Sequence, residues 1–501
     1  MKILRSLKKR KLSIQNFFFK CMLLSNVNFV KSNNKKIHLN WEKNQNKVNA
    51  ILSEIKVSSE SFSEVNFTLN CNIPKLAWGL KIAESSININ YGLGVTCHSK
   101  GIVEGVWDGE FNKFDYSKSE HVFGSGLTIE NKNLIITPPS HMYECVFLIK
   151  NKVTNEVIAS NSLAYCLSFF KNNIKSDDEV FEDIRENNDR QTKLGVLGFE
   201  PLIYEHDSFN LYALYYHNFS ISPEGVKLES RLHERNYANF ESYKNFLEDT
   251  LSSLIDNGES QNRVKQLKAF STLSKGYDSP AVTCLLKDIA DFDCATINVE
   301  VNGLNDSGLE IAEKLGIDCI SCEHPVGSNI QNLGDVEYSA DLVEISNVFF
   351  ATQGLGDDSV FLSFDKYLDD KIVFTGALGD TIWNANNQPP NGIPVRVLYG
   401  KSLTEYRLKK GFAHIPVPTI GAVFPVSIYR LNFLSDMQPY SIKGNYNRPI
   451  ARRIVESAGV SRGMFATEKN ATNPHITNTK TLKKHAFYKV FNDYDFSDSQ
   501  L

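Results

Sequence analysis

Two different hydrophobic rhythms divide this chain of 501 residues. Between residues 61 and about 225, apolar and polar positions alternate over short segments that turn-forming residues separate, which is the two-residue period of a half-buried strand. Segments with this pattern are Val65–Leu69, Ser86–Tyr91, Leu134–Pro139 and Tyr143–Ile149. We therefore expect a separate, mostly antiparallel β domain, and we assign residues 61–235 to it.

From about residue 238 the apolar positions recur with helical spacing. Asn239–Ile255 predicts an amphipathic helix. Leu267–Leu273 predicts a buried strand, and Pro280–Leu286 predicts a helix with proline in its first turn. Further strands are predicted at Cys294–Val301, Asp318–Ser321 and Lys371–Thr375. Alternating strands and helices indicate an α/β fold with a doubly wound parallel sheet, which we place at residues 236–490.

One more helix is expected between Asp306 and Gly316. Aspartate is a common N-cap, because its carboxylate accepts hydrogen bonds from the first backbone N–H groups of a helix. Glycine often follows the last helical residue, because it adopts the left-handed backbone conformation without strain. The pattern therefore predicts that Asp306 begins this helix and that Gly316 ends it.

The composition is that of an ordinary soluble globular protein, with 42% hydrophobic and 22% charged residues. The nine cysteines are scattered and odd in number. Such usage favours a reducing cytoplasm over a disulfide framework. No uncharged apolar run is long enough to span a bilayer. We therefore expect a cytoplasmic protein without a membrane span.

The positive charge is concentrated at the N-terminus. Residues 1–50 contain 12 lysines and arginines and one acidic residue, Glu42, whereas the whole chain has a net charge of −4. A basic arm of this kind can contact nucleic acid, anionic lipid or an acidic partner. Its richness in lysine and asparagine favours a poorly ordered, solvated extension instead. Residues 1–60 are therefore expected to form a flexible basic leader.

The most informative motif lies between a predicted strand and a predicted helix. It reads Ser274-Lys275-Gly276-Tyr277-Asp278-Ser279. A tight Ser/Gly turn at a helix N-terminus presents several backbone N–H groups, and such a nest binds phosphate. A neighbouring carboxylate can hold the metal ion that accompanies nucleotide phosphates. The spacing resembles the pyrophosphate-binding loop (PP-loop) of the ATP pyrophosphatases, whose usual form is S-G-G-x-D-S.

A second motif follows the strand Lys371–Thr375 and reads Gly376-Ala377-Leu378-Gly379-Asp380-Thr381. It resembles the second signature of the asparagine synthetases, usually written S-G-E-G-x-D-E-L-F-G. Together, the two motifs resemble the synthetase half of that family, which includes β-lactam and lasso-peptide synthetases. The resemblance covers about half of the chain and implies an adenine nucleotide α-hydrolase-like fold.

The resemblance implies an AMP-forming carbon–nitrogen ligase that uses ATP and Mg²⁺. A small-molecule or peptide carboxylate would be adenylated and then transferred to ammonia or to a substrate amine. In that family one aspartate from each motif holds the Mg²⁺, and these aspartates correspond to Asp278 and Asp380. The nucleotide-contacting positions implied in this chain are Ser274, Gly276, Asp278, Ser279, Val299 and Gly376.

Two further residues are candidates for catalysis. The segment from Asn447 onward looks like the family's late helical segment, which ends in a lysine that reaches the active site, and Lys469 is the best match. A fixed ammonium group there would stabilise the charge that develops on the acyl-adenylate and the pyrophosphate. Glu405 is a possible partner in deprotonating the amine, by its position alone.

Glutamine-dependent asparagine synthetases carry a nucleophilic cysteine directly after the initiator methionine. This chain begins Met1-Lys2-Ile3, so we expect no glutaminase activity. The β domain at 61–235 would then be a degenerate counterpart of the glutaminase domain.

Two alternatives remain open. A PP-loop ATPase that modifies tRNA would use the basic leader to hold RNA, although the motif at Gly376 and Lys469 argue against it. A non-catalytic relative of the asparagine synthetases is the other, because Lys275, Ala377 and Thr381 depart from the family pattern. The pair Cys319 and Cys322 could hold a metal, but side chains three apart on a strand point to opposite faces. Buried small hydrophobic side chains are the favoured interpretation of that pair.

Overall fold

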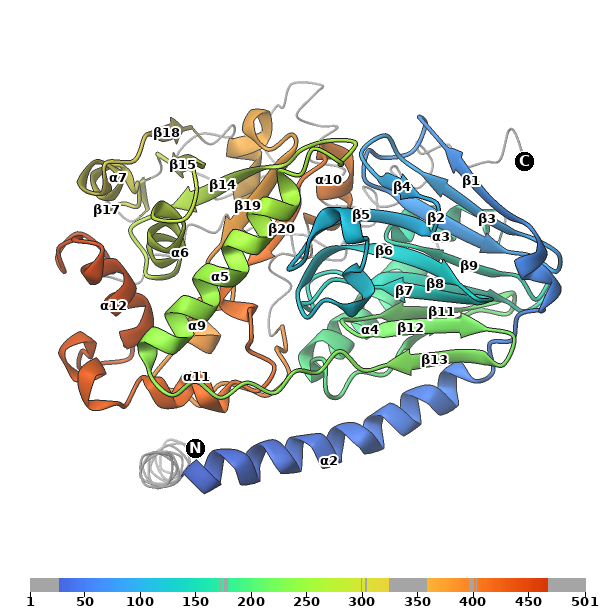
Figure 1. Ribbon diagram of the computed structural model, residues 1–501, viewed down its shortest axis with the longest axis horizontal. Coiled ribbons are helices and arrows are strands. Elements are labelled where there is room, and N and C mark those ends of the chain that lie inside the picture. The colour runs from blue at the N-terminus through green and yellow to red at the C-terminus, as the bar shows by residue number, and fades with distance from the viewer. Residues whose placement is uncertain are drawn as a thin grey trace.

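The computed structural model describes residues 27–171, 173–174, 179–298, 300–301, 304–323, 358–395, 401 and 403–466. The chain forms a β-rich part and an α/β part that lie side by side, with a long N-terminal helix running beneath both (Figure 1). One continuous hydrophobic cluster extends through both parts, from Trp78 and Phe219 to Phe270 and Ile415. The two parts are thus in extensive apolar contact, and the assignment of residues 61–235 to a separate domain stays a prediction.

The β-rich part consists of a seven-stranded and a six-stranded sheet. The first has the order β1-β3-β2-β9-β8-β11-β10, and the second has the order β13-β12-β7-β6-β5-β4. All the pairings in these two sheets are antiparallel except that of β1 with β3. The predicted mostly antiparallel arrangement is thus confirmed.

The strands of this part are β1 (Val65–Leu69), β2 (Trp78–Ile82), β3 (Ile87–Tyr91), β4 (Thr96–His98), β5 (Gly101–Trp107), β6 (Val122–Glu130), β7 (Asn133–Thr137), β8 (Val146–Asn151), β9 (Val157–Ser160), β10 (Leu202–Glu205), β11 (Phe209–Leu214), β12 (Asn218–Ser222) and β13 (Gly225–Glu229). Helices α3 (Leu163–Ser168) and α4 (Val180–Leu194) belong to the same part. All four strands predicted here are present, as β1, β3, β7 and β8, with ends that differ by up to three residues.

The α/β part is built on a five-stranded, all-parallel sheet of order β18-β15-β14-β19-β20. Its strands are β14 (Lys268–Leu273), β15 (Asp293–Ile297), β18 (Cys319–Cys322), β19 (Lys371–Thr375) and β20 (Ala413–Pro416). The first strand, β14, is central: the chain continues to one side through β15 and β18, and then to the other through β19 and β20. This order confirms the predicted doubly wound sheet and places its point of reversal between β14 and β19.

The other elements of the α/β part are α5 (Phe240–Gly258), α6 (Asp278–Lys287), the short pair β16 (Glu300–Val301) and β17 (Leu304–Asn305), α7 (Leu309–Leu315), α9 (Gly379–Ile382), α10 (Leu403–Lys410), α11 (Val426–Leu431) and α12 (Pro449–Ser457). The helix predicted at Asn239–Ile255 is confirmed as α5, which Asn239 caps through a hydrogen bond from the Ser242 backbone N–H.

Helix α7 starts later than its predicted cap. Its N-cap is Gly308 rather than Asp306, so that prediction is wrong by two residues. Asp306 instead accepts hydrogen bonds from the Lys275 backbone N–H at its carboxylate (3.3 Å) and at its carbonyl (3.1 Å). Gly316 ends the helix in the left-handed conformation (φ 67°), as predicted.

Residues 27–52 correct the expectation of a poorly ordered leader, because they form helix α2 (Val27–Leu52). Buried apolar side chains recur along it at Val30, Ile37, Trp41, Val48 and Leu52, with spacings of seven and four residues that put them on one face. The hydrophobic effect thus holds α2 against the molecule despite its polar, asparagine-rich sequence.

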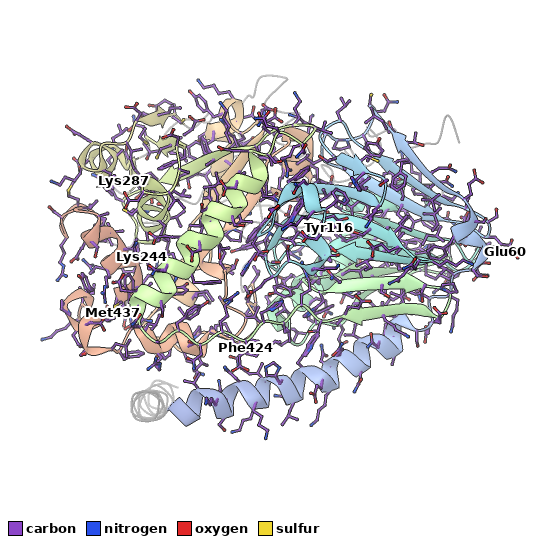
Figure 2. All side chains as sticks on the ribbon, in the orientation of Figure 1. Glu60, Tyr116, Lys244, Lys287, Phe424 and Met437 are labelled. Carbon is purple, nitrogen blue, oxygen red and sulfur yellow. The ribbon has the colours of Figure 1, made fainter. Side chains whose placement is uncertain are left out.

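Helix α2 contacts both parts of the molecule. Val30 packs against Val426 and Tyr429 of α11 in the α/β part, whereas the other end of α2 packs against β13. Midway, the His38 ring lies 4.9 Å from the ring of Phe424, which Figure 2 labels above the helix. The helix therefore spans the junction between the two parts. Among the described helices, none combines the length and the apolar character that crossing a membrane requires.

Lys401 is an unusual feature of this junction. Its side chain is buried and lies near the Tyr215 ring (5.9 Å), and its Nζ has no hydrogen-bond partner within the described part of the chain. Burial lowers the pKa of this amine to about 8, while Cys145 and Asp189 act in the opposite direction. At neutral pH the folded state therefore contains an ammonium group that is poorly compensated.

Replacing Lys401 with methionine should stabilise the protein at pH 7 by about 3 kcal/mol, since each unit of pKa shift corresponds to about 1.4 kcal/mol. The wild-type protein binds fewer protons when folded than when unfolded between pH 8 and 10.5, so its stability rises with pH over that range. The advantage of Lys401→Met should therefore shrink over the same range. Urea denaturation at several pH values measures this. Lys43→Met, on the exposed face of α2, is the control; equal effects of the two substitutions would contradict the prediction.

Candidate functional site

Two loops meet at the point where the strand order of the parallel sheet reverses. Residues 274–277 connect β14 to α6, and residues 376–378 connect β19 to α9. Because β14 and β19 are adjacent and parallel, with Ser271 opposite Phe374, their carboxyl ends lie at the same edge of the sheet. A crevice at such a reversal is where open α/β sheets bind ligands. These are the two loops that the sequence singled out.

The first loop is held by its own serine hydroxyls. The Ser274 backbone N–H donates to Ser279 Oγ (3.0 Å), and the two hydroxyl oxygens lie 2.9 Å apart. The Gly276 backbone N–H donates to Ser274 Oγ (3.2 Å). These bonds fold the loop back over the N-terminus of α6, a ten-residue helix. The first N–H groups of a helix have no partner within it and favour an anion.

The second loop approaches the first so closely that only glycine fits. A Cβ on Gly376 would lie 2.5 Å from the carbonyl carbon of Asp278, and one on Gly379 would lie 2.5 Å from Asp278 Cγ. Gly379 directly precedes Asp380. The structure thus brings together the two loops that carry Asp278 and Asp380.

Replacing Gly379 with alanine should disturb this approach. The new methyl group would overlap the Asp278 carboxylate, and overpacking of this kind costs about 1–3 kcal/mol. We expect a lower melting temperature and at least about tenfold weaker binding of nucleotide, because one Asp278 rotamer would be lost. Calorimetric titration with ATP and Mg²⁺ measures the affinity. Gly463→Ala is the control, since no atom lies within 4 Å of the added methyl group. A Gly379→Ala protein that behaves like this control would contradict the close approach.

The Asp278 carboxylate is half-buried and bonded to an arginine. Nη1 of Arg448 donates to Asp278 Oδ2 in an ion pair. Arg448 lies directly before Pro449, the first residue of α12, and α12 packs against α6. A second arginine of this helix, Arg452, donates through Nη2 to the Tyr277 hydroxyl. Arg448 is therefore bonded directly to the Asp278 carboxylate, whereas Arg452 supports the Tyr277 side chain and is itself paired with Glu456 (3.1 Å).

Asp380 is exposed at the start of α9. Its carboxylate accepts a long hydrogen bond from the Thr381 hydroxyl (3.4 Å), and its backbone carbonyl accepts one from Asn384 Nδ2 (3.1 Å). Mg²⁺ that accompanies a nucleotide is usually held by one or two carboxylates together with phosphate oxygens. Asp278 and Asp380, on two loops in contact, fit this donor set once phosphate is present.

Lys275 occupies the position of the first glycine in S-G-G-x-D-S, and its side chain is directed away from the loop. Its Nζ lies 3.2 Å from Glu310 Oε2 on α7. Its backbone carbonyl accepts a hydrogen bond from the Ala466 N–H (2.6 Å) and its N–H donates to Asp306. The side chain therefore does not crowd the turn. The structure accommodates a lysine here because its side chain reaches Glu310 on α7, while its backbone is bonded to Asp306 and Ala466.

The structure does not bring Glu405 to the two loops. Glu405 lies on α10 and accepts a hydrogen bond from the Ser162 hydroxyl at Oε1 (2.9 Å), next to the N-terminus of α3 in the β-rich part. Burial raises the pKa of this carboxyl to about 7, although bonds from Ser162, Ala164 and Leu163 act in the opposite direction. Glu405 thus contacts the β-rich part at the junction of the two parts. The sequence had instead suggested a place beside the substrate amine.

Other predicted residues are placed only in part. Val299 and Lys469 lie outside the described residues. Cys319 and Cys322 lie at the two ends of β18, with Cys319 paired in register with Cys294. Within the described ranges, no group of three or more metal-binding side chains is found, and all eight cysteines there are free. Of this pair, Cys322 is buried, as the favoured interpretation predicts, whereas Cys319 is only partly buried.

Sequence reasoning missed the role of Arg448. It was noted only as part of the late helical segment, with no contact assigned to it. An arginine directly before a helix-starting proline is a weak sign of a site residue, because the direction of its side chain depends on how the helix packs. Tyr446 and Tyr277, whose rings lie beside the guanidinium, were missed for the same reason.

The comparisons with known proteins give no further support: no protein-family model matches this chain, and neither does any curated protein. The candidate site therefore rests on its residues and their geometry.

Proposed function

We propose that the protein is an ATP-dependent, AMP-forming ligase that adenylates a carboxylate and transfers the acyl group to ammonia or to an amine. One observation carries this proposal. Two motifs separated by about one hundred residues in the sequence lie against each other at the reversal point of a doubly wound sheet, with Asp278 in contact with both glycines of the second motif. An ordinary Ser/Gly turn before a helix would not require a second loop packed against it.

In this proposal the nucleotide phosphates bind over the first loop and the N-terminus of α6. Backbone N–H groups there hold the β- and γ-phosphates, while the Ser274 and Ser279 hydroxyls keep the turn closed. Mg²⁺ held by Asp278 and Asp380 would neutralise phosphate charge. Arg448 adds a fixed positive charge beside the loop, and Arg452 holds Tyr277 behind it.

The chemistry consists of two displacements. An oxygen of the substrate carboxylate attacks the α-phosphorus of ATP, and the bond to the bridging oxygen breaks to release pyrophosphate. The nitrogen of the amine then attacks the acyl carbon, loses a proton and expels AMP. The chain's own groups position the phosphates and stabilise the charge of the leaving pyrophosphate.

The test is ATP–pyrophosphate exchange with Mg²⁺ across a panel of carboxylic acids, combined with calorimetric titration of ATP. Exchange that depends on one acid would support adenylation and identify that half of the substrate pair. Failure of ATP to bind would overturn the proposal and favour a non-catalytic role. ATP could also bind without exchange for any acid of the panel. If no AMP then forms when candidate amines are added, the ligase assignment is overturned and only the nucleotide site is kept.

A further inference from the structure

One oxygen of the Asp278 carboxylate already has a cationic partner. Arg448 donates to Oδ2 of Asp278, and the Arg448 side chain is 6% exposed against 21% for Asp278. Guanidinium is protonated at all physiological pH values, so this pair is a permanent ion pair in the structure. A carboxylate that is neutralised in this way attracts a free divalent cation weakly, because the neighbouring positive charge repels the cation.

The arginine is held in place by aromatic rings as well as by charge. The centre of its guanidinium lies 5.0 Å from the Tyr446 ring and 5.6 Å from the Tyr277 ring. The Tyr277 hydroxyl donates to the Tyr446 backbone carbonyl (3.2 Å) and is bonded to Arg452. This arrangement fixes the plane of the guanidinium beside the loop that would take phosphate. A planar fork of donors in that position matches the geometry of a phosphate group.

We propose that Arg448 exchanges partners when nucleotide binds, leaving Asp278 for a phosphate oxygen and thereby freeing the carboxylate for the metal. Metal would then be accepted at Asp278 only together with the nucleotide. This inference rests on the proposed nucleotide site, and it assigns to Arg448 both phosphate binding and control over the order of binding. The exchange forms and breaks only ionic and hydrogen-bonding contacts.

Two independent features support the exchange. The first loop itself supports Arg448, because the ring of the loop residue Tyr277 lies 5.6 Å from the centre of the guanidinium. Asp380, the second predicted metal ligand, is exposed, and within the part of the chain that the structure describes no arginine forms an ion pair with it. Asp380 is thus accessible to the metal, whereas Asp278 stays paired with Arg448 until an anion binds that arginine.

The test uses the full chain and Mn²⁺ in place of Mg²⁺, with free Mn²⁺ measured by electron paramagnetic resonance. Without nucleotide, the wild-type protein should retain no Mn²⁺ at this site, and with α,β-methylene-ATP it should retain one ion per chain. Arg448→Gln removes the positive charge, so its affinity for Mn²⁺ without nucleotide should rise by at least about tenfold. The same variant should bind the nucleotide analogue about tenfold or more weakly, because a charge-assisted contact to phosphate is lost.

Two variants complete the design. Arg448→Lys keeps the charge but loses the planar fork, so it should still exclude free Mn²⁺ while binding nucleotide more weakly. Arg453→Gln is the matched control on the same helix, because its guanidinium pairs with Asp436 (2.5 Å) and Glu241 (2.8 Å) away from the loop. It should leave both affinities unchanged. Circular dichroism establishes that each variant is folded, and Arg448→Lys keeps the inference testable if the glutamine variant does not fold.

Binding of Mn²⁺ to the nucleotide-free wild type that Asp278→Asn abolishes would overturn the inference. So would an Arg448→Gln protein with unchanged affinities for both Mn²⁺ and nucleotide. The Mn²⁺ affinity measured without nucleotide tests whether Arg448 keeps the metal from Asp278, and this result does not depend on nucleotide binding. Absence of any nucleotide binding to the wild type would instead count against the proposed function, so the two failures are distinguishable.

Discussion

Replacing Asp278 with alanine should lower the rate of ATP–pyrophosphate exchange by at least about a thousandfold. A metal ion on the phosphates supplies several kcal/mol of charge stabilisation, and each 1.4 kcal/mol corresponds to about a factor of ten in rate. The same change leaves Arg448 without its carboxylate partner, so its guanidinium would bind pyrophosphate without a compensating metal. Product release would then slow as well.

The control for this experiment is Asp293→Ala. Asp293 begins β15, at the opposite edge of the same sheet, and it also pairs with a basic residue, Lys371 (2.6 Å). Exposed pairs of this kind contribute about 0–1 kcal/mol, so the fold and the exchange rate should be nearly unchanged. A similar loss in both variants would point to a general effect on folding. Exchange that survives in Asp278→Ala would exclude Asp278 as a metal ligand.

Much of the α/β part could be predicted because its signals are local. The strand Lys371–Thr375 was predicted with its actual ends, and the helix after Asn239 has a capping residue that the sequence displays. The meeting of the two glycine-containing loops follows from the parallel sheet, since consecutive carboxyl ends share one edge. Local patterns therefore located both loops before their contact was known.

Long-range contacts were not predictable in this way. Arg448 is 170 residues from Asp278 in the sequence, and its direction is set by the packing of α12 against α6. Glu405 was chosen by its position in the chain, but the junction of the two parts gives it Ser162 as a partner. Helix α2 is a different case, because the spacing of Val30, Ile37 and Trp41 was visible but the basic composition was given more weight.

A buried ionic cluster joins the two parts of the molecule, and its disruption should have the largest effect on stability. Arg407 on α10 donates through Nη1 to Glu104 Oε2 (2.7 Å) and through Nε to Glu144 Oε1 (2.7 Å). All three side chains are at most 3% exposed. The carboxylates come from β5 and from the segment before β8, whereas the arginine comes from the α/β part.

Replacing Arg407 with methionine should destabilise the protein by at least about 3–5 kcal/mol, because two buried carboxylates would lose their common cation. Burial already raises the pKa of Glu144, and the neighbouring Arg407 opposes that rise. Without the arginine the pKa of Glu144 rises further, so the folded state holds a proton that the unfolded state releases. The loss of stability should therefore be greatest at neutral and higher pH and smaller near pH 4. Chemical denaturation across this pH range measures it.

The triple variant Arg407→Met, Glu104→Gln, Glu144→Gln separates the charge from the packing. Removing the negative charges together with the arginine leaves no uncompensated ion, so much of the lost stability should return. If the single and triple variants are equally unstable, the packing of the long arginine side chain accounts for the effect instead. The cluster is also connected to the second loop through two histidines. Thr375 directly precedes Gly376 and its hydroxyl lies 2.9 Å from His414 Nε2, while the His414 ring is 6.2 Å from that of His141, whose Nε2 lies 3.8 Å from Glu144 Oε2. Weaker nucleotide binding in the single variant, restored in the triple variant, would show that the junction positions the second loop.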